Sequence, residues 1–225
     1  MSPVVSSGVT IVDRAPLTRD RVVVAALAFI DRHGVDALSM RKLGQELGVE
    51  AMSLYNHVES KDDLLDAVAS LLLELVEVPD SSTDWRGRVM AIADNVRAVG
   101  LAHPQAFPLL ASRNLSSLES WEPIAAAFAL SLDAGLSAEE GVYVVAAMCG
   151  LILGSVLLEI SSMSVAAQCG RLSAEDVPED RPVLRQYVEH RDRTTVDQQY
   201  RQSLQLIIDG MERRLGGIVP AVPAN

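Results

Sequence analysis

Apolar residues recur at helical spacing through most of the chain, and no stretch alternates with the two-residue period of a strand. The first periodic segment covers residues 18–33, where Thr18 is placed to cap the helix and Gly34 to end it. A shorter helix is expected between Ser39, as its cap, and Gly48, as its end. Two more helices are predicted in this half of the chain, at residues 51–58 and from Lys61 to Pro79.

Longer apolar patterns follow a polar stretch at residues 79–84, which we interpret as a domain boundary. They predict long helices at residues 84–101, 119–134, 137–163 and 195–215. One short helix is expected at residues 103–113. Residues 164–194 are polar and contain proline, so we expect a loop there, with one helical turn near Tyr187.

These elements predict an all-α protein with a three-helix head, joined by a long fourth helix to a helical-bundle body. We expect the head at residues 17–78 and the body at residues 79–216, between a flexible arm at residues 1–16 and a tail at residues 217–225. Apolar residues make up 49% of the chain and aromatic residues only 4%. Ala, Val and Leu must therefore fill the core, which suits packed helices.

The formal net charge of −11 at first disfavours a nucleic-acid partner. However, residues 1–62 carry seven Lys/Arg and eight Asp/Glu, so the head is close to neutral and the acidic excess lies in the body. An acidic body repels phosphate and would help to orient the head toward a duplex.

One uncharged stretch, from Gly141 to Leu158, approaches the length of a membrane span and contains a GxxxG pattern. Its flanks are acidic, with no Lys/Arg bias and no aromatic belt. We interpret it as a buried helix of a soluble bundle. The N-terminal residues 1–16 lack the basic start and apolar run of a signal peptide, so the cytoplasm is expected and no membrane partner.

The chemistry of an enzyme is not apparent in the sequence. Cys149 and Cys169 are too few for a disulfide framework, and the four histidines are scattered without metal-ligand spacing. There is no Gly-rich phosphate loop or Ser/His/Asp order, and the acidic pairs at Asp62 and Glu139 point in different directions on a helix. We therefore expect no catalytic residue, cofactor or metal.

The informative motif is SMRKLGQELGVEAMSLYNHV, residues 39–58, followed by Lys61. Two short helices meet at a turn where Gly48 can take the left-handed conformation. The two helices are expected to cross one another around a small core formed by Leu43, Leu47, Val49, Leu54 and Val58. The second helix carries no acidic residue, so it can enter a major groove without charge repulsion. Its exposed residues are expected to be Ala51, Met52, Ser53, Tyr55, Asn56 and His57.

This run, with its Leu-Tyr-x-His-Val core and later lysine, resembles the TetR family of transcriptional regulators. The resemblance is strong over residues 17–75, and it continues through Trp85, His103 and the segment 150–159 toward the tetracycline-repressor subgroup. It implies a DNA-binding regulator, usually a repressor, that acts as a homodimer. Two heads are also required physically, because one head offers few phosphate contacts.

The resemblance also implies roles for single residues. Arg41 would reach a guanine edge or a phosphate, and Ser53, Tyr55 and Lys61 would bind phosphates, although each could instead serve the surface or packing. His57 is more often structural at this place. Base-reading positions carry Ala51 and Met52, which offer only apolar contact, so the operator should differ from that of the tetracycline repressors.

In the family, the last two long helices form a four-helix dimer interface. The corresponding interface residues here are Gly150, Gly154, Ile207, Ile208 and Met211, unless they form an intramolecular core. An effector pocket is implied inside the body, beneath the fourth helix. Its candidate walls, each of which could be ordinary core, are Ile92, Val96, Phe107, Leu110, Trp121, Phe128, Met148 and Ile152.

The positions that hold the metal–drug complex in tetracycline repressors correspond here to Glu77, Ile92, Val96 and Leu110, which are mostly apolar. The effector is therefore expected to be an apolar or amphipathic molecule and not magnesium-tetracycline. Two alternatives remain: an enzyme, and a DNA-binding or partner-binding protein whose body is filled solid. A cavity beneath the fourth helix would separate the last alternative from a ligand sensor.

Overall fold

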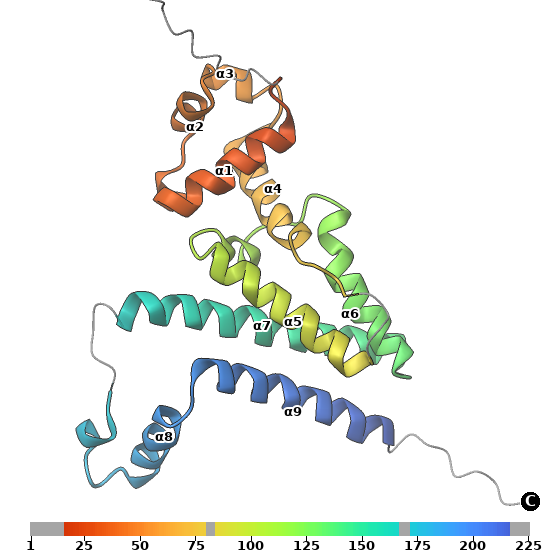
Figure 1. Ribbon diagram of the computed structural model, residues 1–225, viewed down its shortest axis with the longest axis vertical. Coiled ribbons are helices and arrows are strands. Elements are labelled where there is room, and N and C mark those ends of the chain that lie inside the picture. The colour runs from red at the N-terminus through yellow and green to blue at the C-terminus, as the bar shows by residue number, and fades with distance from the viewer. Residues whose placement is uncertain (1–15, 80–83, 167–171, 217–225) are drawn as a thin grey trace, which may run out of the picture.

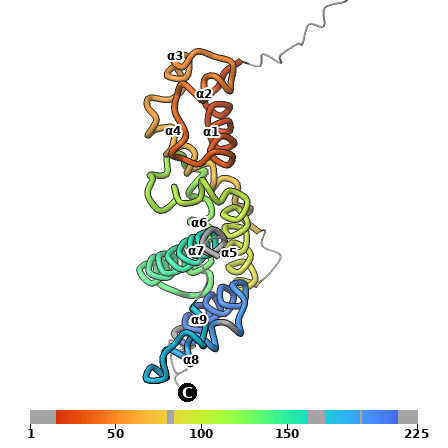
Figure 2. The backbone as a smooth tube through the Cα atoms, turned by 90° about the vertical axis from the view of Figure 1, so that its left-hand side faces the viewer, coloured from red at the N-terminus to blue at the C-terminus, as the bar shows by residue number. Residues whose placement is uncertain are grey.

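The computed structural model describes residues 16–79, 84–166 and 172–216, and these residues contain helices and no strand. The predicted arm, the tail and Cys169 lie outside the described residues, apart from Pro16. A small head and a larger body follow one another along the long axis of the molecule (Figures 1 and 2). The all-α class, with a helix-turn-helix head on a helical body, is confirmed.

The head is built from four α-helices with a 3₁₀ turn, η1 (Val35–Ala37), between the first two. The helices are α1 (Arg19–His33), α2 (Met40–Leu47), α3 (Ala51–Leu54) and α4 (Lys61–Glu74). Hydroxyl caps start three of them, because Thr18, Ser39 and Ser60 each accept a hydrogen bond from a first-turn amide. The apolar faces of α1, α2 and α4 meet in one core around Ile30, Leu43 and Val68.

The body consists of long helices that pack across one another, with α7 at the centre (Figure 1). Its helices are α5 (Trp85–Ala102), α6 (Glu122–Asp133), α7 (Ala138–Ala166), α8 (Pro182–Asp192) and α9 (Val196–Gly216). The 3₁₀ helices η2 (Phe107–Ala111) and η3 (Glu119–Trp121) lie between α5 and α6, and η4 (Ala174–Asp176) precedes α8. Helix α7 packs against α5, α6 and α9, so this apolar helix forms the middle layer of the body.

Four predicted elements differ from the structure. Residues 164–194 were expected to be a loop, but they include α8, three turns long, with Pro182 at its start and basic residues in its last turn. Among the described side chains of α8, Val188 alone is buried, so the apolar pattern was too weak to reveal the helix. The short helix expected at residues 103–113 is a 3₁₀ helix of five residues, Phe107–Ala111, with Pro108 in its first turn. The third helix ends at Leu54 rather than near Val58, and the fourth ends at Glu74 rather than at Pro79.

Helix α7 is long and apolar enough, from Ala138 to Ser161, to cross a membrane by length and composition alone. The core helix of a soluble bundle passes the same test, and α7 packs among three other helices. Only 28% of its most apolar window is buried within the single chain, however. One face of α7 is therefore left without a partner among the described residues.

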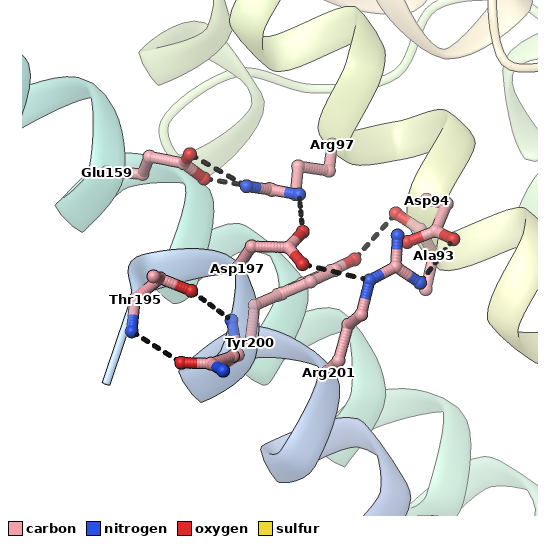
Figure 3. A network of polar contacts seen from close by, with 9 residues as sticks. Ala93, Asp94, Arg97, Glu159, Thr195, Asp197, Tyr200 and Arg201 are labelled. Atoms are coloured by element: carbon pink, nitrogen blue, oxygen red, sulfur yellow. Dashed lines mark hydrogen bonds and ion pairs between the residues drawn. The ribbon is translucent and has the colours of Figure 1, made fainter. Parts of the chain in front are cut away.

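A polar network joins α5, α7 and α9 (Figure 3). Arg97 donates two hydrogen bonds of 2.8 Å to the carboxylate of Glu159 and one of 2.7 Å to Asp197. Its guanidinium lies 5.1 Å from the ring centroid of Tyr200, whose hydroxyl donates to the carbonyl of Ala93 at 2.7 Å. Burial raises the pKa of the Tyr200 hydroxyl above its usual range. The network fixes the register of three helices by contacts distant in sequence.

Candidate nucleic-acid interface and body cavity

The turn between α2 and α3 depends on two glycines. Gly48 has φ 70° and ψ 28°, the left-handed conformation that ends α2 and that a glycine adopts without steric cost. At Gly44 a Cβ atom would lie 2.9 Å from the carbonyl oxygen of Val49, so only glycine lets α2 approach the turn this closely. Sequence reasoning identified Gly48 but missed Gly44, whose only signal was a glycine inside a helix.

The predicted small core of the helix-turn-helix is present, but its members are buried to different degrees. Leu43, Leu54 and Val58 are buried, while Leu47 and Val49 are only partly buried. Leu54 and Val58 hold α3 against the head, which leaves the opposite side of α3 facing outward. The motif therefore presents a rigid, exposed face.

That exposed face carries the residues that were predicted to contact DNA. Met52 is 74% exposed and Tyr55 is 44% exposed, so both large side chains are accessible on this face. Arg41 and Asn56 are also exposed, and the remaining candidates, Ala51, Ser53, His57 and Lys61, are partly exposed. Within the described part of the chain, neither Arg41 nor Lys61 forms an ion pair, so both cations are available to an anionic ligand.

The orientation of α3 is set by its neighbours. Arg19, at the start of α1, donates to the carbonyl of His57 at 2.9 Å and to both carboxylate oxygens of Asp63 in α4. The Arg19 guanidinium holds the pKa of Asp63 below its usual range, against the effect of burial. On the other side of the head, Arg32 of α1 pairs with Glu46 of α2.

The head is tied to the body along α4. The Ser116 amide donates to Ser70 Oγ at 2.6 Å, and Arg113 Nη1 lies 2.7 Å from Asp62 Oδ1. A second connection runs from α1, where Asp31 Oδ2 lies 2.8 Å from His103 Nδ1 at the end of α5. A change in the body near residues 103–117 therefore acts directly on α1 and α4.

A cavity of about 220 Å³ lies in the body below α4. Five of the predicted residues are on its wall: Ile92, Val96, Leu110, Met148 and Ile152. The wall also includes residues that were not predicted to line a pocket: Leu73, Val89, Leu115, Pro123, Ile124, Ala127, Val145, Cys149 and Leu153. Val145 shares the helical face of Met148 and Ile152, so its spacing could have revealed it. No wall residue carries a charge.

The other three predicted pocket residues do not line the cavity. Phe107 is fully buried and packs against Gly100, where a Cβ atom would lie 3.0 Å from its ring. Trp121 is 50% exposed at the start of α6. Phe128 packs over Gly141 instead. It follows the cavity-facing Ala127 directly in the helix, so its side chain points to a different side of α6. The prediction chose large aromatic residues, whereas the cavity wall is aliphatic.

The candidate dimer residues divide into two groups. Gly150 and Gly154 have no atom within 4 Å of an added Cβ, so they face open space in the single chain. Ile208 is fully buried and Met211 nearly so, which places these two in the intramolecular core, while Ile207 is partly buried. Their burial in the single chain favours the alternative of an intramolecular core for Ile208 and Met211.

Other apolar residues are exposed on the two helices that were predicted to pair. Leu158 of α7 is 73% exposed, and Leu206 of α9 is 67% exposed. With Gly150 and Gly154 they form what we call the α7/α9 face. A solvent-exposed apolar face of this kind is characteristic of a protein–protein contact.

Two family models cover this chain and agree with the division into head and body. Residues 22–68 match the model described as bacterial regulatory proteins, tetR family, and residues 78–215 match the tetracyclin repressor-like, C-terminal domain. The chain belongs to the TetR family. It is therefore a helix-turn-helix, DNA-binding transcriptional regulator and not an enzyme.

Individual relatives from the TetR family agree with this assignment. An HTH-type transcriptional regulator of Saccharopolyspora erythraea is 36% identical over 144 residues, 64% of this chain and 61% of that protein. The class A tetracycline repressor from transposon 1721 of Escherichia coli is 31% identical over 201 residues, 88% of this chain and 92% of that protein.

Solved structures of TetR-family proteins extend the likeness to the whole described fold. Apo ActR of Streptomyces coelicolor superposes with a TM-score of 0.80 at 30% identity, covering 90% of this chain and 98% of that chain. ActR in complex with actinorhodin gives a TM-score of 0.78 at 29% identity, covering 90% of this chain and all of that chain.

Proposed function

We propose that this TetR-family chain is a ligand-responsive repressor that binds a palindromic operator as a homodimer and leaves it when a small apolar or amphipathic effector enters the body. The observation that carries this proposal is the cavity below α4. Leu73 of α4 forms part of its wall, while the first residue of α4, Lys61, lies beside the exposed face of the head. One helix thus reaches both sites.

The DNA contacts are proposed from the exposed face. Arg41 would meet a guanine edge or a phosphate, and Ser53, Tyr55 and Lys61 would bind phosphates near the start of α4, where the positive end of the helix dipole lies. Met52 and Ala51 would lie in the major groove, with Asn56 and His57 at its edge. Because Met52 offers only apolar contact, thymine methyl groups are the base feature that it fits best.

The dimer is proposed to form through the α7/α9 face. The two glycines of α7 permit close approach of a second helix, and burial of Leu158 and Leu206 would stabilise the pair at roughly 25 cal/mol per Å² of apolar area. Leu158→Glu would then give a monomer in analytical ultracentrifugation. Leu132→Glu, a matched change at an exposed position of α6, would leave the dimer intact.

The effector is proposed from the chemistry of the cavity. Its aliphatic wall, with the thiol of Cys149 as a weak polar group, favours a ligand that buries mostly apolar surface. Magnesium-tetracycline does not fit, because Ile92, Val96 and Leu110 offer no metal or hydrogen-bonding ligand and Glu77 is not on the wall. That ActR has been crystallised with actinorhodin supports an effector site in a body of this fold.

The response is proposed to be a shift between two states. Effector in the cavity would displace Leu73 and so move α4, which changes the separation of the two heads. Heads bound to successive major grooves must lie about 34–36 Å apart, so a small movement lowers operator affinity. A differential affinity of a few kcal/mol for the two states is sufficient for such a switch. The cytoplasm is the compartment in which such a regulator meets DNA.

The test begins with selection of bound duplexes from a random pool. Palindromic winners with thymine near the Met52 position are expected, and binding should fall with Arg41→Ala but not with Arg193→Ala, an exposed arginine beyond α8. A metabolite screen by thermal shift then identifies the effector. A ligand-independent DNA binder, the second candidate, would yield the same palindromes but no stabilising compound.

A further inference from the structure

Arg113 lies between the cavity and the head. It follows η2, and its flanking residues Leu110 and Leu115 are on the cavity wall. Its side chain points the other way, to the first turns of α4, where Nη1 lies 2.7 Å from Asp62 Oδ1 and 3.8 Å from Asp66 Oδ1. One short segment therefore contacts both the effector site and the start of α4.

The first two turns of α4 carry three carboxylates. Asp62, Asp63 and Asp66 follow Lys61, and Asp62 is 79% exposed at its side chain. Carboxylates near DNA repel the phosphates and lower affinity. Asp63 is neutralised within the head by Arg19. The positive charge that pairs with Asp62 and Asp66 comes instead from Arg113 of the body.

We propose that Arg113 is a positioning residue that sets operator affinity by neutralising Asp62 and Asp66, and that effector binding acts in part by withdrawing this charge. The proposal rests on the proposed placement of Lys61 on operator phosphate. Displacement of Leu110 and Leu115 by a ligand moves Arg113 away from α4. The uncovered carboxylates then face the DNA backbone, which adds an electrostatic component to the movement of the heads.

A purely mechanical role for the same ion pair makes a different prediction. If Arg113 only held α4 in place, loss of either partner would weaken DNA binding equally. If the pair acts through charge, loss of Arg113 weakens binding, whereas loss of the Asp62 charge does not. The neutral variant Asp62→Asn distinguishes the two, because it breaks the pair and removes the repulsive charge together.

The experiment measures affinity for the selected duplex by fluorescence anisotropy, across a series of salt concentrations. At about 50 mM salt, Arg113→Gln should bind about tenfold more weakly than wild type, with a shallower slope of log affinity against log salt. Arg113→Lys and the charge-matched control Arg193→Gln should stay within about twofold. Asp62→Asn should bind at least as tightly as wild type, and Asp62→Asn with Arg113→Gln should bind more tightly than Arg113→Gln alone, with the charge of Asp66 still uncompensated.

Two results would overturn the proposal. One is an Asp62→Asn variant as weak as Arg113→Gln, with no recovery in the double variant, which would assign the pair a mechanical role. The other is an Arg113→Gln variant that binds like wild type. Circular dichroism and thermal melts check that each variant is folded. If Arg113→Gln does not fold, Arg113→Lys and Asp62→Asn still distinguish the two roles. Failure of wild type to bind any duplex would instead refute the proposed function itself.

Discussion

Arg19 and Asp63 form a two-point ion pair across the head. The guanidinium donates to the two carboxylate oxygens at 3.0 and 2.7 Å, and so joins the first residue of α1 to the first turn of α4. Asp63 also accepts the amide of Glu59 at 2.8 Å. Because Arg19 reaches the carbonyl of His57 as well, the pair holds the segment that follows α3 and fixes how α3 is presented.

The Arg19–Asp63 pair should make the folding stability of the head depend on pH in the acidic range. Its hydrogen bonds hold the folded-state pKa of Asp63 below the ordinary 3.8. A depressed carboxyl pKa stabilises the fold above the unfolded value, and this contribution is lost as the pH falls through the folded value. Because Arg19 is solvent-exposed, the contribution should be about 1 kcal/mol or less. Urea unfolding of wild type and Asp63→Asn, between about pH 6 and 3, should show converging stabilities.

Asp36→Asn is the matched control for this pH series. Asp36 is exposed on η1, and its side chain has no hydrogen-bond partner among the described residues. Its neutralisation should leave the difference from wild type constant with pH. An Asp63→Asn curve parallel to that of wild type would contradict the role assigned to the pair.

Gly44 gives a prediction in which two effects oppose each other. Alanine at a helix interior is intrinsically favoured over glycine by about 1 kcal/mol. Here its Cβ would lie 2.9 Å from the backbone oxygen of Val49, which cannot move without opening the turn. Overpacking of this kind costs about 1–3 kcal/mol, so the clash wins and Gly44→Ala should destabilise the head and weaken operator binding. Chemical denaturation and anisotropy measure the two effects.

Gly48 offers the comparison for Gly44. Its φ is 70°, but an added Cβ would meet no atom within 4 Å. Asparagine tolerates the left-handed conformation, so Gly48→Asn should be nearly neutral for folding. Equal losses in Gly44→Ala and Gly48→Asn would show that backbone strain, and not close approach, governs the turn.

The sequence was sufficient for features that depend on neighbouring residues. Thr18 and Ser39 cap helices that bury their apolar faces, and Gly48 ends α2, as their positions in the sequence indicated. Ser60 caps α4 in the same way, although only the start of that helix, at Lys61, was predicted. Helix α8 escaped because it is mostly polar and, among its described side chains, buries only Val188. Local patterns thus predict an element where its burial is extensive.

Features that depend on distant contacts could not be predicted. Arg113 and Asp62 are 51 positions apart, and nothing in either neighbourhood indicates that they meet. The same holds for the cavity, where Phe107 fills the core beside Gly100 while the smaller Ala127 lines the open space. Residue type indicated apolar surroundings for both, but only the packing of α5, α6 and α7 decides which faces the cavity.

The hydroxyl of Tyr200 should contribute measurably to the stability of the body. Tyr200 is buried, and its only polar group donates to the carbonyl of Ala93 at 2.7 Å. Tyr200→Phe keeps the ring beneath Arg97 but removes this hydrogen bond, so a loss of about 1 kcal/mol is expected. Tyr143→Phe is the control, because Tyr143 is exposed and its hydroxyl donates to Glu139 in the same helix. Equal urea midpoints for wild type and Tyr200→Phe would contradict this account.

Filling the cavity should separate effector response from DNA binding. Met148 is buried on the wall, and tryptophan in its place would project a larger ring into the open space. Since a cavity is available, the cost to folding should stay below about 1 kcal/mol, less than overpacking of a solid core. Met148→Trp should bind the selected operator like wild type yet fail to be released by the effector found in the screen. Ala125→Trp, which adds the same ring on the exposed side of α6, should respond normally. Release of Met148→Trp at wild-type effector concentrations would place the effector elsewhere in the body.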